Sequence, residues 1–132
     1  GDAALRHVAA ELRKQLRSND ILARYGGEEF VALLPTANEK KGVEAAERMR
    51  AAVEKSDIEL LDGQVLNVTV SIGVSTCVVD KTGVQSPINR TVLIGVADKA
   101  LYQAKGSGRN RVVSGGKVGI SSEQAVSIAA SS

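Results

Sequence analysis

Hydrophobic residues in the first part of the chain follow a helical pattern and then a strand pattern. Residues 3–17 carry leucine, valine and alanine at spacings of three and four positions, with charged residues between them, which predicts an amphipathic helix. Two short apolar runs follow at residues 21–25 and 28–34, separated by Gly26-Gly27. Because both glycines can adopt positive φ, this arrangement predicts a β-hairpin with a glycine turn.

The alternation of helices and strands continues through the middle of the chain. Residues 38–56 and 91–105 show helical periodicity, and glycines follow the second of these segments. Between them, apolar and small polar residues alternate over residues 66–74, which is the pattern of a strand with one apolar face. Residues 80–90 are expected to form a loop.

The order of these elements indicates an α+β domain over residues 1–113 that closes with a short strand at 111–113. Residues 114–132 are rich in glycine, serine and alanine, a composition that provides few large apolar groups for a core. They are expected to form a poorly ordered tail. A ferredoxin-like antiparallel sheet with flanking helices needs one more strand before the first helix, so its first, central strand is expected to be missing from this chain.

Composition limits the chain to one small domain and argues against some partners. The 132 residues are 43% hydrophobic, enough for a single core. The 17 basic and 15 acidic residues leave a formal charge of +2 without long runs of one sign, and aromatic residues make up only 2%. This predicts no nucleic-acid partner. With one cysteine and no apolar stretch of membrane-spanning length, the piece is expected to be cytoplasmic, although a longer protein containing it could be membrane-anchored.

Two glutamates directly after the glycine pair are candidates for chemistry. Successive side chains of a strand point to opposite faces, so Glu28 and Glu29 would enter different sites. Gly26 and Gly27 leave room for phosphates to approach the backbone, and a carboxylate beside them could hold Mg²⁺ through oxygen. The alternative interpretation is a tight hairpin with two solvated glutamates.

Basic residues at the end of the third predicted helix form a second candidate group. Lys105 and Arg109 flank Gly106-Ser107-Gly108, where an ammonium and a guanidinium could both reach one polyphosphate. The alternative is that they only oppose the helix dipole. Taken alone, Arg17 and Asp20 would be a local ion pair.

Four motifs in a fixed order resemble those of one known family. The segment Arg24-Tyr25-Gly26-Gly27-Glu28-Glu29-Phe30 is similar to the signature hairpin of the GGDEF family, in its GGEEF form. Gly1-Asp2-Ala3-Ala4-Leu5 resembles the family's GDxxL helix start, and residues 67–74 resemble its strand ending in SIGV. Residues 97–105, followed by Gly108-Arg109-Asn110, resemble its closing motif.

The resemblance implies a nucleotide-cyclase-like fold and a diguanylate cyclase, which condenses two GTP into cyclic di-GMP across a homodimer with Mg²⁺ or Mn²⁺. The 3′-hydroxyl of one GTP attacks the α-phosphorus of the other, twice, so the domain supplies positioning and charge. By the motif match, Glu28 would be the catalytic and metal-binding carboxylate. The substrate-binding residues would be Gly26, Gly27, Lys105 and Arg109 at the phosphates, Asp2 at the guanine edge, and Glu29 in a less central place.

The same resemblance implies a site for the product. Arg17-Ser18-Asn19-Asp20 matches the family's RxxD inhibitory site, which lies five residues ahead of the glycine hairpin there and here. Arg17 and Asp20 would bind cyclic di-GMP, with Arg48 of the second helix as a third contact. Feedback inhibition by the product is therefore expected.

The chain departs from the family at its N-terminus. The family's first strand carries an Asp that binds Mg²⁺, and the following helix an Asn that binds guanine; both would precede Gly1. The chain thus resembles a fragment of a larger protein with an upstream sensory domain. It is expected to be weakly active or inactive alone, with its sheet patched by another chain or by rearrangement. The alternative is a non-catalytic domain that senses GTP or serves as a cyclic di-GMP receptor.

Overall fold

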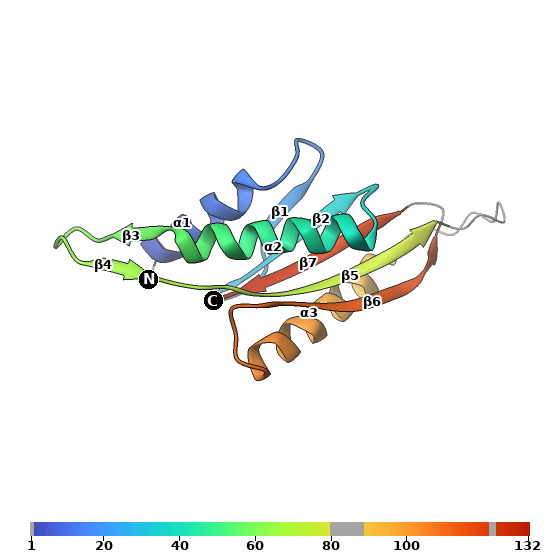
Figure 1. Cartoon of the computed structure of the whole chain (residues 1–132). Helices are drawn as coiled ribbons and strands as arrows, with labels where there is room; N and C mark the ends of the chain where they lie inside the picture. Colours follow the sequence, from blue (N-terminus) through green and yellow to red (C-terminus); the bar gives the residue numbers. More distant parts are fainter. Residues whose placement is uncertain (1, 80–88, 122–123) are drawn as a thin grey trace.

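The computed structural model describes residues 2–79, 89–121 and 124–132, which form one sheet, a small two-stranded ribbon and three helices (Figure 1). The helices are α1 (Asp2–Lys14), α2 (Glu39–Lys55) and α3 (Arg90–Gly106). The strands are β1 (Ile21–Arg24), β2 (Glu29–Pro35), β3 (Asp57–Glu59), β4 (Val65–Asn67), β5 (Ser71–Val79), β6 (Val112–Ser121) and β7 (Ala125–Ser131).

Five strands form the main sheet in the order β1-β2-β7-β5-β6. Strand β7 is antiparallel to both of its neighbours, β2 and β5, whereas β5 and β6 are parallel. Helix α2 covers one face of the sheet and α3 the other (Figure 1). This is the α+β arrangement of a central sheet with flanking helices that the sequence predicts.

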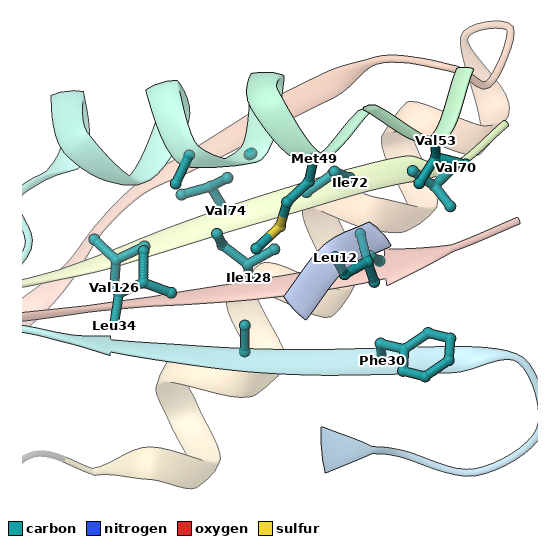
Figure 2. Packing of buried hydrophobic residues seen from close by; sticks show 14 of the residues in the cluster. Leu12, Phe30, Leu34, Met49, Val53, Val70, Ile72, Val74, Val126 and Ile128 are labelled. Atoms are coloured by element: carbon teal, nitrogen blue, oxygen red, sulfur yellow. The ribbon is translucent and has the colours of Figure 1, made fainter. Parts of the chain in front are cut away.

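The larger core lies between the sheet and the helices α1 and α2. Figure 2 shows Met49 of α2 pointing toward Ile72 and Ile128 of the sheet, with Leu12 of α1 nearby. All four residues are at most 1% exposed. On the opposite face, α3 contributes a smaller cluster around Ala129.

The prediction that residues 114–132 form a poorly ordered tail is wrong, because the described residues of this segment form most of β6 and all of β7. All seven residues of β7 are buried, and both edges of the strand are paired, with β2 and with β5. Small residues are suitable in this strand because α3 packs closely against it, as Ala129 does against Ala97 and Leu101. For this reason a composition rich in small residues does not indicate disorder here. Val126 and Ile128 supply the larger groups on the other face.

Strand β7 lies where the expected missing strand would lie. In a ferredoxin-like sheet the strand before the first helix is central and antiparallel to its neighbours, and β7 has this position between β2 and β5. In the structure, a strand of the same chain occupies this position. The ordered domain therefore extends beyond the predicted boundary at residue 113.

Two strand predictions need smaller corrections. The predicted strand 66–74 is divided into β4 and β5, because β4 turns back to pair with β3 around a turn in which Gly63 has φ 83°. The predicted strand 111–113 continues as β6 to Ser121, supported by its parallel pairing with β5. Most of the predicted loop 80–90 lies outside the described residues.

None of the helices in the described part of the chain has the length and hydrophobicity to cross a membrane.

Candidate functional site

The turn between β1 and β2 is a tight connection with an accessible backbone. The Tyr25 amide donates to the Glu29 carbonyl at 2.7 Å, and the Arg24 Nε donates to the Gly27 carbonyl at 3.0 Å. Gly26 and Gly27 have φ of 67° and 24°, and no atom lies within 4 Å of the place where a Cβ would be. The predicted glycine turn is confirmed, and it leaves room for a ligand to approach.

Glu28 is exposed on the face of the sheet that α1 covers. It lines a cavity of about 70 Å³ together with residues from the start of α1 and with Ser132, which follows β7. The Ser132 hydroxyl donates a long hydrogen bond, 3.5 Å, to Glu28 Oε2. The end of β7 is thereby placed directly beside the carboxylate that the sequence assigns to catalysis.

Glu29 faces the opposite side, toward α3. The pKa of Glu29 is raised from 4.5 to about 7 by partial burial, the largest cause, together with a hydrogen bond and charge repulsion from Asp98, while the Lys105 ammonium acts in the opposite direction. The two glutamates therefore enter different environments, as the strand alternation predicts. A raised pKa makes a carboxyl a weaker metal ligand at neutral pH than a fully ionised carboxylate.

The raised pKa of Glu29 predicts a pH-dependent stability. Between pH 4.5 and about 7, Glu29 stays protonated in the folded state but loses its proton in the unfolded state. The cost of ionising Glu29 in the folded state therefore lowers the free energy of unfolding as the pH rises. This loss of stability is absent below pH 4.5 and complete above about pH 7. Removing the charge with Glu29→Gln should raise the free energy of unfolding at pH 8 by roughly 1 kcal/mol, a value discounted for solvent screening. Urea unfolding at pH 4.5 and pH 8 measures this. An equal gain at both pH values would contradict it.

Arg109 lies in the loop that follows α3 and points toward the end of β7. Its amide donates to the Ala104 carbonyl at 3.0 Å, its φ is 63°, and its guanidinium Nη1 donates to the Ser132 carbonyl at 3.2 Å. Ser132 thus contacts both Arg109 and Glu28. Lys105, one turn earlier, acts on Glu29 instead. Within the described ranges, no hydrogen bond or ion pair joins Glu28 directly to either cation.

The metal-binding capacity of this site is small. No cluster of three or more His, Cys, Asp or Glu side chains suitable for a metal occurs among the residues that the structure describes. Mg²⁺ is usually held by one or two carboxylates together with substrate phosphates and waters. Glu28 therefore fits a single ion that a bound phosphate completes, and it does not fit an all-protein cage.

A larger cavity of about 400 Å³ lies between α1 and β1 and shares Leu5 and Phe30 with the small one. Its walls combine these apolar side chains with three arginines, Arg6, Arg13 and Arg24. Such a surface suits a flat aromatic ring that carries negative charge. Asp2 is the first residue of α1, and its side chain lies outside the described part of the structure.

A separate pocket of about 290 Å³ brings together the three residues predicted for product binding. Arg17, Asp20 and Arg48 all line it. Asp20 accepts a hydrogen bond from the backbone amide of Arg17 at 2.8 Å, and its carboxylate thereby stabilises the turn after α1. The two residues are joined by this bond and not by a side-chain ion pair. The sequence interpretation missed Lys41 and Gln124, which also line the pocket. Lys41 lies seven residues before Arg48 on the same helix, and this spacing could have indicated that the two side chains share a helix face. No sequence pattern could have indicated Gln124.

Comparison with known proteins gives consistent matches. The family model described as diguanylate cyclase, GGDEF domain, matches residues 1–111. Diguanylate cyclase A of Treponema denticola is 43% identical over 112 residues, which cover 85% of this chain and 28% of that protein. The response regulator PleD of Caulobacter vibrioides is 40% identical over 114 residues, which cover 86% of this chain and 24% of that protein. The chain therefore spans about a quarter of the length of these two curated relatives.

Solved structures show the same likeness in three dimensions. The GGDEF domain of DgcB from Caulobacter crescentus, solved in complex with c-di-GMP, has a TM-score of 0.73 and 29% identity, covering 86% of this chain and 64% of that one. SiaD from Pseudomonas aeruginosa, solved with its activator SiaC, has a TM-score of 0.72 and 32% identity, covering 86% of this chain and 40% of that one.

Proposed function

This chain belongs to the GGDEF family of diguanylate cyclase domains, and we propose that it binds GTP and takes part in condensing two GTP molecules into cyclic di-GMP. The observation that carries the proposal is the meeting of Glu28 and Arg109 at Ser132, beside the open glycine turn. A carboxylate and a guanidinium around an accessible backbone turn form a suitable environment for a triphosphate.

Each proposed residue contributes a separate interaction with GTP. The accessible turn at Gly26 and Gly27 lets the phosphates lie against the backbone, while Lys105 and Arg109 neutralise the β- and γ-phosphates. Asp2, at the start of α1, accepts hydrogen bonds from the guanine edge. Glu28 would hold Mg²⁺ or Mn²⁺, which when bound stabilises charge on the phosphates.

The reaction requires two copies of the domain. Each copy binds one GTP, and each 3′-hydroxyl attacks the α-phosphorus of the GTP on the facing copy, so that two phosphodiester bonds form and two pyrophosphates leave. The chain itself supplies positioning and charge stabilisation. We therefore propose a homodimer as the catalytic form, in the bacterial cytoplasm where GTP is available, under the control of a sensory domain on the same protein.

We predict little turnover from this chain alone, because Glu28 is the only carboxylate among the described residues that lines the cavity beside the glycine turn. Incubation with GTP and Mg²⁺, followed by nucleotide chromatography, should give less than about 1% of the cyclic di-GMP made by the intact Treponema denticola enzyme, since each lost charge contact costs tenfold or more. Glu28→Gln should abolish that product, and Glu29→Gln should leave it within about threefold. Product that persists in Glu28→Gln would contradict the assigned role.

We further propose that the pocket lined by Arg17, Asp20 and Arg48 binds cyclic di-GMP as a feedback inhibitor. Arg48→Ala should weaken binding of cyclic di-GMP about tenfold or more, because it removes a charge-assisted contact to phosphate or guanine. Lys40→Ala, on the same helix but outside the pocket, is the matched control. Titration calorimetry measures both. Equal affinity in the two variants would rule out this pocket as the product site.

A second candidate function is a non-catalytic module that senses GTP or serves as a cyclic di-GMP receptor. The observation that favours it is the contrast between the two sites: the product pocket contains all three predicted residues, whereas the described residues of the substrate site include no cluster of three metal ligands. Tight binding of cyclic di-GMP by a dimeric chain without any turnover of GTP would support this function over the enzyme. SiaD was solved with a protein activator, and a regulatory protein partner is compatible with either function.

A further inference from the structure

The loop that carries Arg109 is fastened to α2 through the side chain of Asn110. Asn110 Nδ2 donates to Glu54 Oε2 at 2.5 Å, and Asn110 Oδ1 accepts from Arg50 Nη1 at 3.1 Å. The Asn110 amide also donates to the hydroxyl of Ser71 at 3.2 Å. One residue of the loop is therefore held at three points, by α2 and by the first residue of β5.

The two partners of Asn110 on α2 are themselves held in place. Arg50 Nη1 donates to Glu54 Oε1 at 3.4 Å, and Arg50 Nε donates to Glu47 Oε2 at 3.1 Å. The hydrogen bond from Asn110 is the main reason why the pKa of Glu54 is lowered, with Arg50 contributing. Glu54, Arg50 and Asn110 thus form a closed set of hydrogen bonds between α2 and the loop.

The backbone of this loop needs such support. Arg109 and Asn110 have φ of 63° and 46°, and two consecutive non-glycine residues in the left-handed region are retained only where the surroundings hold them. Asparagine tolerates this conformation better than most residues. Without the contacts of Asn110, the left-handed conformation of Arg109 would lose part of its support, and its guanidinium would be held less firmly on the Glu28 side of the site.

We propose that Asn110, held by Glu54 and Arg50 of α2, is a positioning residue that fixes the Arg109 guanidinium where it meets the β- and γ-phosphates of a bound nucleotide. The inference rests on the proposed function, because it takes guanine nucleotides as the ligand. Glu54, Arg50 and Asn110 do not line the cavity that contains Glu28. Their effect is transmitted through the backbone of Arg109.

The test compares GTP with GMP, which lacks the two outer phosphates. Asn110→Asp keeps the shape of the side chain and its tolerance of positive φ, but turns the donor to Glu54 into an acceptor. In the full chain with Mg²⁺, this variant should bind GTP about tenfold more weakly and GMP within about twofold of the parent. Asn67→Asp is the matched control, since Asn67 also donates to α2, at the Glu54 carbonyl, without contacting the loop.

Two further variants test the route through Arg109. Adding Glu54→Gln to Asn110→Asp supplies a new amide donor and restores the net charge, so GTP affinity should return to within about threefold of the parent. In an Arg109→Ala background, Asn110→Asp should cause no further loss, because the residue it positions is gone. Thermal unfolding confirms that each variant is folded.

The outcomes separate this inference from the function on which it rests. Equal losses for GTP and GMP, or GTP affinity no lower than in Asn67→Asp, would overturn the positioning role alone. Additive losses in the Arg109→Ala background, or a failed rescue by Glu54→Gln, would do the same. A parent chain that binds no guanine nucleotide would overturn the proposed function and this inference together.

Discussion

Replacing Ile128 with aspartate is expected to unfold the domain at 25 °C. Ile128 is 1% exposed in the middle of β7, where it pairs with Ala32 of β2 and Val74 of β5 and contacts the main core (Figure 2). Burying an unpaired carboxylate there costs on the order of 5 kcal/mol or more. This equals much of the total stability of a small domain, so circular dichroism should show loss of structure and no cooperative thermal transition.

The matched control is the same substitution at Ile21, which lies in the edge strand β1 and is 54% exposed. Ile21→Asp should change the free energy of unfolding by less than about 1 kcal/mol. A fold in which residues 125–131 were only a disordered tail would tolerate aspartate equally well at both positions. Equal stability of the two variants would therefore contradict the central place of β7.

Gly73→Ala is expected to destabilise the domain by about 3 kcal/mol or more. A Cβ at this position of β5 would lie 2.1 Å from the Ala97 carbonyl oxygen and 2.2 Å from the Leu101 amide nitrogen, both in the backbone of α3. Because backbone atoms cannot move aside individually, α3 would have to shift away from the sheet, and the cluster around Ala129 would lose its packing.

Gly95→Ala provides the control for this prediction. Gly95 lies on α3 itself, where an added Cβ meets no atom within 4 Å, and alanine is the better helix former. This variant should be more stable than the parent by about 0.5–1 kcal/mol. Denaturant unfolding of both variants measures the difference. A loss below about 1 kcal/mol in Gly73→Ala would show that α3 does not depend on close contact with β5.

The elements that the sequence predicted well are those set by local patterns. Helix α2 was expected at residues 38–56 and runs from Glu39 to Lys55, because its apolar stripe and the Asn38 cap, which accepts from the Lys41 amide, are both local signals. The hairpin was predicted for the same reason, since two adjacent glycines specify its turn. These signals need no knowledge of the rest of the fold.

Strand β7 could not be predicted from its own residues. Its position depends on two distant neighbours, β2 and β5, and on the close approach of α3, which makes alanine and serine suitable in a core position. Ser127 even buries a hydroxyl without a partner among the described residues, which sequence patterns associate with a surface or tail. Partner strands supplied the stabilisation that composition alone did not indicate.

The candidate site was predicted in part. Motif matching placed Glu28 and Arg109 in one site, and the structure brings them to a common neighbour; it also places Arg17, Asp20 and Arg48 in one pocket. That neighbour, Ser132, could not be predicted, because it reaches the site only through the placement of β7. Asn110 was visible within a motif, but its contacts with α2 depend on residues 56 and 60 positions away.

The most direct test of the account is a calorimetric titration of this chain with GTP in the presence of Mg²⁺, compared with the same titration using ATP. We predict saturable binding of one GTP per chain, with ATP at least about tenfold weaker because the proposed contact of Asp2 with the guanine edge would be lost. A folded chain that binds neither nucleotide, or binds both equally well, would contradict the claim that it is a guanine nucleotide-binding diguanylate cyclase module.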